Sequence, residues 1–243
     1  MIYLILPAYN EEKNLIKVFK KINSLRIVKK LSVILVDDCS TDNTLLLRTK
    51  KNKFKLKYIK HKINKGLSSS LETGFKKINS KLKKGDLIIT MDSDNTHPIQ
   101  IIPKMISLMK KKESDLIIAS RFMKSSKVNG LSFFRTTLSL LAKIIFHLFF
   151  PFKGLKEYTC NYRIYQSSLI KKLMKEKNFF KNEDFNIAVK ILLFLIKVNK
   201  DIRISEYPLI LNYHYKEGQS KMKVTKNIFL TLKVIFLKKF LNQ

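Results

Sequence analysis

The 243-residue chain contains no tryptophan, two cysteines, five prolines and six glycines. So little proline and glycine excludes a collagen-like or low-complexity chain, and 45% hydrophobic residues exclude a disordered one. Cys39 and Cys160 lie far apart and belong to no CxxC or Cys/His pattern, which excludes a cysteine-based zinc site and favours a reducing, cytoplasmic environment. The length suits one large domain, with or without an appendage.

Acidic residues are also scarce, since 18 of them face 49 basic residues and the formal net charge is +31. Six of the basic residues are arginines, and the lysines are spread along the whole chain. Two interpretations stay open, namely the codon bias of an AT-rich genome and an electrostatic role towards anionic lipid or nucleic acid. Nucleic-acid binding predicts clustered basic and aromatic residues, and because the lysines are diffuse we expect no nucleic-acid partner.

Long hydrophobic runs are missing as well, because no apolar stretch reaches the ~18–20 residues that a bilayer span requires. The N-terminal apolar run stops at Pro7 and has no preceding basic region, so it predicts a buried strand rather than a signal peptide. Two longer apolar segments, residues 138–152 and 228–241, are interrupted by lysine or histidine. They suit interfacial helices, core helices or dimer helices better than membrane spans.

Short β-type runs alternate with helical runs through the first half of the chain. We expect strands at residues 2–6, 32–36, 56–60, 86–91 and 115–119, and helices at residues 11–25, 44–50, 67–82 and 98–111. This alternation predicts an α/β fold with a mostly parallel sheet covered by helices on both faces. Ligands bind such sheets at the carboxyl ends of the strands. The sequence has no GxGxxG and no GxxxxGK[ST], which disfavours a dinucleotide fold and a P-loop.

Two carboxylates, Asp92 and Asp94, follow the apolar strand expected at residues 86–91. If the extended backbone continues, both point the same way and repel each other unless a divalent cation neutralises them. Mg²⁺ or Mn²⁺ carrying a diphosphate meets that need, because hard oxygen ligands suit hard cations. The alternative, a turn with Asx hydrogen bonds, is disfavoured by the position at a strand end. His97, before Pro98, is either a metal or phosphate contact or a turn residue at a helix start.

Asp37 and Asp38 end another expected strand. Asp38 can accept hydrogen bonds from a nucleobase, whereas Asp37 or Ser40 can cap the next helix. Nucleobase binding and helix capping concern different residues of this cluster, so both interpretations stay open.

Eight segments stand in a recognisable order: LPAYNEEKNL, ILVDDCSTDNT, NKGLSSSLETGF, DLIITMDSDNTHP, DLIIASR, GLSFFRTTLS, YTCNYRIY and ISEYPLILNYHYKEGQSKMK. Together they resemble the family-2 glycosyltransferases, which have the GT-A nucleotide-sugar-binding fold. The resemblance is greatest to the branch of polyprenyl-phosphate (dolichol-phosphate) mannosyl or glucosyl synthases. It implies a catalytic domain over residues 1–225, followed by an amphipathic helix over residues 226–243 that suits a membrane interface.

The resemblance implies a donor pocket for GDP-mannose or UDP-glucose at the strand-ending loops. The implied nucleotide-sugar contacts are Pro7, Tyr9, Glu11, Asp38, Lys65, Gly66, Asp92 and Ser93. Within this set Asp38 would face the base, and Lys65 and Gly66 the ribose or phosphates. Asp92 and Asp94 would hold Mg²⁺ or Mn²⁺ with the donor diphosphate.

The implied acceptor is a polyprenyl phosphate, and the implied outcome is inversion at the sugar carbon. Arg121 and Arg135 would act in catalysis with Asp94 by supplying positive charge to phosphates. Ser220 and Lys221 would close over the site and, with Arg135, contact the acceptor phosphate. A lipid monophosphate is already an anion near neutral pH and needs no general base. The implied location is cytoplasmic and peripheral, at the inner face of the cell membrane.

Three positions depart from the family pattern, all in the acceptor half. Lys190 stands at an acidic position, Tyr215 at an arginine position, and Asn161 at a glycine position. Glu183 and Asp184 lie close enough in sequence to substitute for the missing acid. An alternative activity therefore stays open, in which the sugar moves to a hydroxyl of a glycan or glycolipid and Glu183 or Asp184 serves as the general base.

Overall fold

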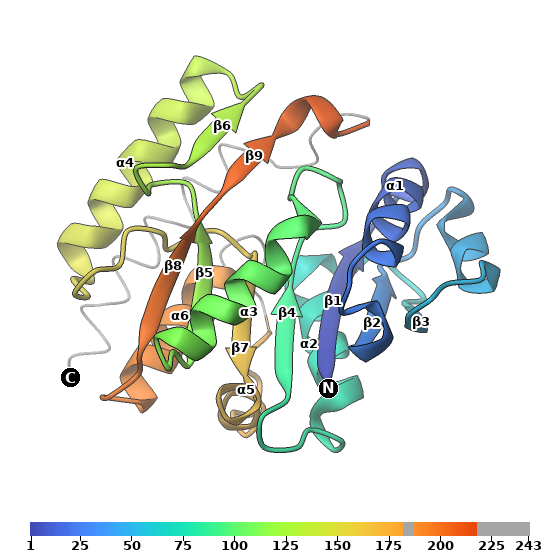
Figure 1. Ribbon diagram of the computed structural model, residues 1–243, viewed down its shortest axis with the longest axis horizontal. Helices are drawn as coiled ribbons and strands as arrows, with labels where there is room; N and C mark the ends of the chain where they lie inside the picture. The colour runs from blue at the N-terminus through green and yellow to red at the C-terminus, as the bar shows by residue number, and fades with distance from the viewer. Residues whose placement is uncertain (182–186, 218–243) are drawn as a thin grey trace.

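The computed structural model describes residues 1–181 and 187–217. Its core is a seven-stranded sheet with the strand order β3-β2-β1-β4-β7-β5-β8, and a parallel pair, β6 and β9, lies beside it (Figure 1). The strands are β1 (Ile2–Ala8), β2 (Leu31–Asp37), β3 (Lys55–Lys60), β4 (Leu87–Thr90), β5 (Leu116–Ser120), β6 (Lys127–Asn129), β7 (Arg163–Gln166), β8 (Ile204–Pro208) and β9 (Ile210–Asn212). Every pairing in the large sheet is parallel except those of β7, which runs antiparallel to both β4 and β5.

Helices cover both faces of this sheet. They are α1 (Glu12–Asn23), α2 (Gly66–Asn79), α3 (Ile102–Lys111), α4 (Phe133–Phe149), α5 (Ser167–Leu173) and α6 (Ile187–Val198), with short 3₁₀ helices at Val28–Lys30, Asn43–Thr49, Ile99–Ile101 and Tyr213–Tyr215. In Figure 1, α3 lies in front of the sheet and α2 and α6 lie behind it. The fold class predicted from the sequence, a mostly parallel sheet flanked by helices, is confirmed.

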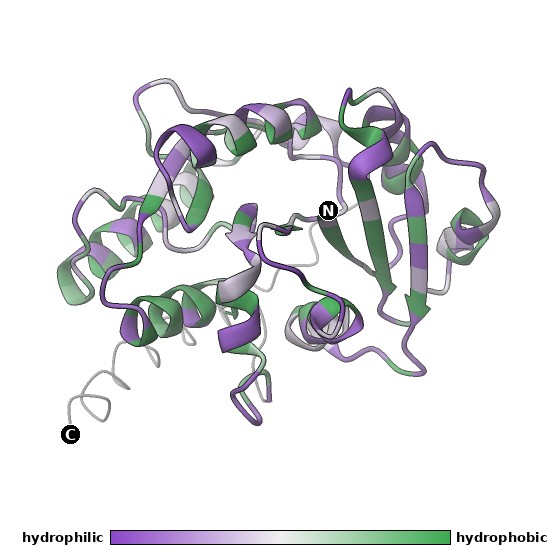
Figure 2. Cartoon of the chain, turned by 60° about the horizontal axis from the view of Figure 1, so that its bottom comes forward, coloured by the Kyte–Doolittle hydropathy of each residue, from purple (hydrophilic) through white to green (hydrophobic). Residues whose placement is uncertain are grey.

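The two hydrophobic cores follow from the alternation of side chains along each strand. On β1, Leu4 and Leu6 face the core shared with α1 and α3, whereas Tyr3 and Ile5 face the core shared with α2, α5 and α6. Strands buried on both faces read as continuous apolar runs, and Figure 2 shows the strands beside the N-terminus as largely hydrophobic. On α2, Gly74 lets the helix approach β1 closely, because an added Cβ would lie 2.6 Å from Ile5.

Local sequence patterns located most elements of the first half to within a few residues. The helix expected at residues 44–50 is wrong in type, because Asn43–Thr49 forms a 3₁₀ helix. Of the apolar segment at residues 138–152, residues 138–149 belong to α4, where Phe146 is the buried side chain and most others are partly or fully exposed. The segment at residues 228–241 lies outside the described residues. In the part of the chain that the structure describes, no helix is both long and apolar enough to cross a membrane.

Candidate functional site

The carboxyl ends of β1, β2 and β4 meet at one edge of the sheet, and the acidic motif lies there. Thr90, the last residue of β4, is paired with Ile5 of β1, so the following loop lies level with the end of β1. The loop is tied to β1 by Ser93, whose Oγ donates a 2.6 Å hydrogen bond to the Pro7 carbonyl. The chain bends at Ser93 instead of continuing as a strand, which gives Asp92 and Asp94 different surroundings.

Three donors from two residues hold the Asp94 carboxylate. Its Oδ1 accepts hydrogen bonds from the amide and hydroxyl of Thr96, and its Oδ2 forms a 2.8 Å ion pair with Nζ of Lys216. Burial alone raises the pKa of Asp94, but the charges of Lys216 and His97 lower it below its usual value. Burial lowers the pKa of Lys216, and the charges of Asp94, Glu11 and Asp92 raise it by more. Three carboxylates therefore act on one ammonium group at this edge.

Asp92 is the more accessible carboxylate, with 44% of its side chain exposed. Asn161 donates a 3.3 Å hydrogen bond to its Oδ1, and Nδ1 of His97 lies 4.0 Å from its Oδ2. His97 returns towards Asp92 because Asn95, at φ 63°, turns the loop through a left-handed conformation that asparagine tolerates. The loop thus brings His97 beside the residue five positions before it.

Hydrogen bonds join the loops that follow β1 and β2. Ala8 is paired with Asp37 in the last register position, so both loops begin at the same level. Asn10 accepts a 2.7 Å bond from the Thr41 amide, and the Glu11 amide donates to Thr44. Glu11 is buried, whereas Tyr9 is 37% exposed. The first predicted nucleotide contacts therefore border the loop after β2.

Asp38 is buried and organises the start of α2. Its carboxylate accepts hydrogen bonds of 2.8 Å from the Lys65 amide and 2.7 Å from the Gly66 amide, and Nδ1 of His61 lies 2.7 Å away. An anion at a helix N-terminus is favourable, and Gly66 has a φ of 82° that favours glycine. The structure therefore brings together Asp38, Lys65 and Gly66, as the sequence grouped them. A contact between Asp38 and a nucleobase stays a prediction.

Arg121 follows β5, and its guanidinium is paired with a carboxylate that the sequence analysis did not single out. Nε and Nη2 of Arg121 each lie 2.8 Å from a carboxylate oxygen of Glu157, whose side chain is 0% exposed. Burial raises the pKa of Glu157, but the charge of Arg121 lowers it below its usual value. Glu157 also accepts from the amides of Thr159 and Cys160. A contact of Arg121 with a phosphate stays a prediction.

The charges of Arg121 and of the acidic loop both affect the pKa of Tyr213. Burial raises the pKa of Tyr213, the positive charge of Arg121 lowers it, and the charges of Asp94 and Asp92 raise it. Beside them, burial raises the pKa of the Cys160 thiol to about 12, so this cysteine is neutral near pH 7. The charges of Asp92, Asp94 and Arg121 therefore all act on Tyr213, and a site shared by these three residues stays a prediction.

Other predicted residues lie apart or outside the described residues. Arg135 lies in the first turn of α4. Among the residues that the structure describes, no ion pair joins Arg135 to the acidic loop. Ser220 and Lys221 lie outside the described residues, as do Glu183 and Asp184. Lys190, in α6, donates a 2.6 Å hydrogen bond to the Phe179 carbonyl.

Sequence reasoning did not assign Lys216, Glu157 or His61 to the site. The sequence does contain a feature that could have identified Lys216, because this residue directly follows Tyr215, one of the three departures from the family pattern. The sequence feature that could have identified Glu157 is weaker: it is an acidic residue, in a chain with few acidic residues, directly before the motif YTCNYRIY. His61 follows a strand whose residues carry no motif, so nothing local marks it.

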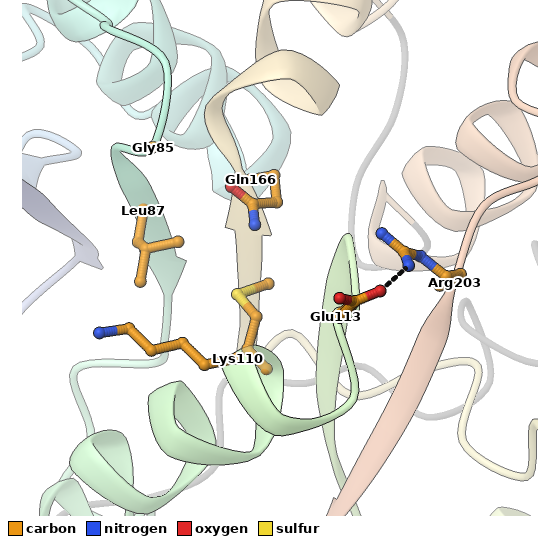
Figure 3. A pocket seen from close by; sticks show the side chains of 7 residues that line it. Gly85, Leu87, Lys110, Glu113, Gln166 and Arg203 are labelled. Carbon is orange, nitrogen blue, oxygen red and sulfur yellow. Dashed lines mark hydrogen bonds and ion pairs between the residues drawn. The ribbon is translucent and has the colours of Figure 1, made fainter.

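Two cavities lie at opposite ends of the sheet. One of about 890 Å³ is bordered by α1, the loop of Asn95 to Pro98 and the segment of Asn212 to Glu217, so it adjoins the acidic loop. The other, of about 500 Å³, lies where β4 begins, and Figure 3 shows Glu113 and Arg203 paired beside it. Because ligands bind parallel sheets at the carboxyl ends of their strands, the first cavity is the one related to the site.

Comparison with protein families gives one match, to the model of glycosyl transferase family 2 over residues 3–174. The chain is 30% identical over 236 residues to a dolichol-phosphate mannosyltransferase of Pyrococcus furiosus. This match covers 96% of this chain and 62% of the relative. It is 30% identical over 184 residues to a dodecaprenyl-phosphate galacturonate synthase of Rhizobium johnstonii, covering 73% of this chain and 52% of the relative. The chain thus spans less than two thirds of the length of either relative.

A solved structure supports the fold. The glucosyl-3-phosphoglycerate synthase of Mycobacterium tuberculosis, in complex with Mn²⁺, UDP-glucose and phosphoglyceric acid, superposes with a TM-score of 0.69 at 16% identity. The match covers 97% of this chain and 79% of that one. At this identity the likeness concerns the fold.

Proposed function

The chain belongs to glycosyl transferase family 2, and on that premise we propose that it transfers a hexose, mannose or glucose, from a nucleotide sugar to a polyprenyl phosphate. The proposal that the chain binds a nucleotide-sugar donor rests on the acidic pair Asp92 and Asp94 at the carboxyl end of β4, with the loops after β1 and β2 beside it. The names of the two relatives, both enzymes of polyprenyl phosphates, support the acceptor half.

The acidic loop suits a divalent cation. Asp94 already has a cation, the ammonium of Lys216, at 2.8 Å, and Asp92 and Glu11 add their charges at the same point. We propose that Asp92 and Asp94 hold Mg²⁺ or Mn²⁺ together with the donor diphosphate, because oxygen ligands suit these ions. The bound cation would supply charge stabilisation to the departing nucleoside diphosphate. The structure solved with Mn²⁺ and UDP-glucose supports a cation in this fold.

The proposed reaction is a direct displacement with inversion. An oxygen of the acceptor phosphate attacks the anomeric carbon, a carbon–oxygen bond forms, and the bond to the donor diphosphate breaks with its electron pair leaving on the nucleoside diphosphate. The loops after β1 and β2 would orient the nucleotide, and Lys216 would move from Asp94 to the diphosphate. Arg135, Ser220 and Lys221 remain the proposed contacts of the acceptor phosphate.

The donor is tested by calorimetry with GDP-mannose, UDP-glucose, UDP-N-acetylglucosamine and dTDP-sugars, each with and without Mn²⁺. We expect micromolar binding of one donor, and only with the metal, because the diphosphate otherwise meets the negative charge of Asp92 and Asp94. A folded sample that binds none of them, with Mn²⁺ and a short-chain polyprenyl phosphate both present, contradicts the proposed function.

The same donor then separates the two acceptor classes. We expect transfer of labelled sugar to a short-chain polyprenyl phosphate and none to the corresponding polyprenol. Product on a hydroxyl instead would favour the alternative activity on a glycan or glycolipid, and mutation of Glu183 and Asp184 would then locate its base.

We further propose that α4 lies on an anionic membrane surface, where a polyprenyl phosphate is dissolved. Large apolar side chains on α4 are exposed to solvent, among them Phe133 at 88%, Leu148 at 72% and Phe134 at 63%. A helix with such a face beside a strongly basic chain, with a net charge of +31, suits the headgroup region of anionic lipid. Residues 226–243, proposed as a second interfacial helix, lie outside the described residues.

Leu148→Glu combined with Leu141→Glu is expected to weaken binding to vesicles that contain anionic lipid by at least about tenfold. Burying one leucine contributes roughly 1.5–3 kcal/mol, and a glutamate is also repelled by the surface. Leu46→Glu is the matched control, because Leu46 is 58% exposed on the 3₁₀ helix of Asn43–Thr49. Co-sedimentation of the full chain gives the measurement. Equal losses in both variants would place the lipid contact elsewhere.

A further inference from the structure

His97 carries a buried polar atom without a partner. The residue is 6% exposed, and among the described residues its Nδ1 has no hydrogen-bond partner. Its ring packs on that of Tyr162, with centroids 5.1 Å apart. Leaving a buried polar atom without a hydrogen bond destabilises a protein, so such an atom in a native structure points to a binding partner.

A carboxylate oxygen of the acidic pair lies near this nitrogen. Oδ2 of Asp92 lies 4.0 Å from Nδ1, while the other oxygen of Asp92 accepts from Asn161. A charged N–H···O bond spans about 2.7–2.9 Å, so 4.0 Å is too long for one. A cation held at this loop would instead find a nitrogen on His97 and an oxygen on Asp92, both suitable as ligands.

Asp94 belongs to the same loop as Asp92 and His97. Oδ1 of Asp94 accepts hydrogen bonds from the amide and hydroxyl of Thr96, the residue directly before His97. The three side chains do not yet converge, since within residues 1–181 and 187–217 no three acidic, histidine or cysteine side chains form a metal-binding group. Asp92 is 44% exposed and accepts one hydrogen bond, from Asn161, whereas Asp94 is paired with Lys216.

We propose that Nδ1 of His97 is a third protein ligand of the divalent cation held by Asp92 and Asp94. This inference rests on the proposed function, because that function supplies the cation. An imidazole ligand has a consequence for metal choice. Nitrogen suits Mn²⁺ better than Mg²⁺, which prefers oxygen ligands, so His97 would favour Mn²⁺ at this site.

The test is pulsed electron paramagnetic resonance of Mn²⁺ bound to the full chain with the nucleoside diphosphate of its donor. We expect electron spin echo modulation from a directly bound ¹⁴N, converted to a ¹⁵N pattern when only histidine is ¹⁵N-labelled. This arm needs no mutation, so it is independent of whether a variant folds. Bound Mn²⁺ without histidine coupling would overturn the ligand assignment alone, whereas a folded chain that binds no Mn²⁺ would overturn the proposed metal site with it.

Single substitutions identify which histidine binds Mn²⁺. His97→Gln should abolish the coupling and weaken Mn²⁺ binding by at least about tenfold, with a smaller loss for Mg²⁺. His147→Gln is the matched control, since His147 is exposed on α4, and it should keep both. His214, exposed beside the same cavity, is the competing ligand. Loss of the coupling in His214→Gln and its retention in His97→Gln would contradict the proposal.

Discussion

Asp94→Asn is expected to abolish metal-dependent donor binding and to lower kcat/KM by about a hundred- to a thousandfold, with the fold retained. A loss of this size is typical when one preorganised charged or polar group is removed from a transition-state site. The fold should persist because the asparagine oxygen can still accept the hydrogen bonds from Thr96. What disappears is the charge that now faces Lys216 and, in the proposed complex, the cation.

Asp92→Asn should lose metal-dependent donor binding as well, and Asp201→Asn serves as the control for both variants. Asp201 is exposed between α6 and β8, away from the carboxyl ends of the strands. Calorimetry with the donor and Mn²⁺, beside circular dichroism for the fold, separates a lost site from a lost structure. Donor affinity near that of the wild type in both Asp92→Asn and Asp94→Asn would contradict the site assignment.

Glu157→Gln is expected to lower the free energy of unfolding by about 3–5 kcal/mol, because it leaves the guanidinium of Arg121 without its buried counter-charge. Glu157 is 0% exposed, its two oxygens hold Nε and Nη2 of Arg121, and it also accepts from backbone amides. Glutamine offers one acceptor oxygen and places an amide group against these donors. Urea unfolding measures the change.

Glu113→Gln is the matched control for this variant, since Glu113 also pairs with an arginine, Arg203, but at the surface, where the two side chains are 75% and 56% exposed. Exposed pairs contribute roughly 0–1 kcal/mol, so its unfolding free energy should change little. The lowered pKa of Glu157 adds a pH signature. Stabilisation is complete above the unfolded glutamate pKa of about 4.3 and is lost as the pH falls towards the lower folded value. Equal effects of both variants would contradict a structural ion pair at Glu157.

Local patterns located much of the fold. Alternating apolar runs placed β1, β2 and β4, and the helix expected at residues 11–25 corresponds to α1, which buries Leu15, Val18, Phe19 and Ile22. These signals are local, because the side-chain period of a strand or a helix is fixed by its own backbone. The sequence analysis did not predict β7. This strand has only four residues and lies antiparallel between β4 and β5, so it is not part of a β/α alternation that the sequence could reveal.

The sequence by itself determined the strand-end position of Asp92 and Asp94 and, through its ordered motifs, the family. Only the tertiary structure decided which charges meet there. Lys216 reaches Asp94 across 122 positions of the chain, and Glu157 reaches Arg121 across 36. The order and register of the strands set such contacts, and periodicity within a segment does not encode them. The same reason explains why Asp38, grouped with Lys65 and Gly66 by its motifs, showed its role at the start of α2 only in three dimensions.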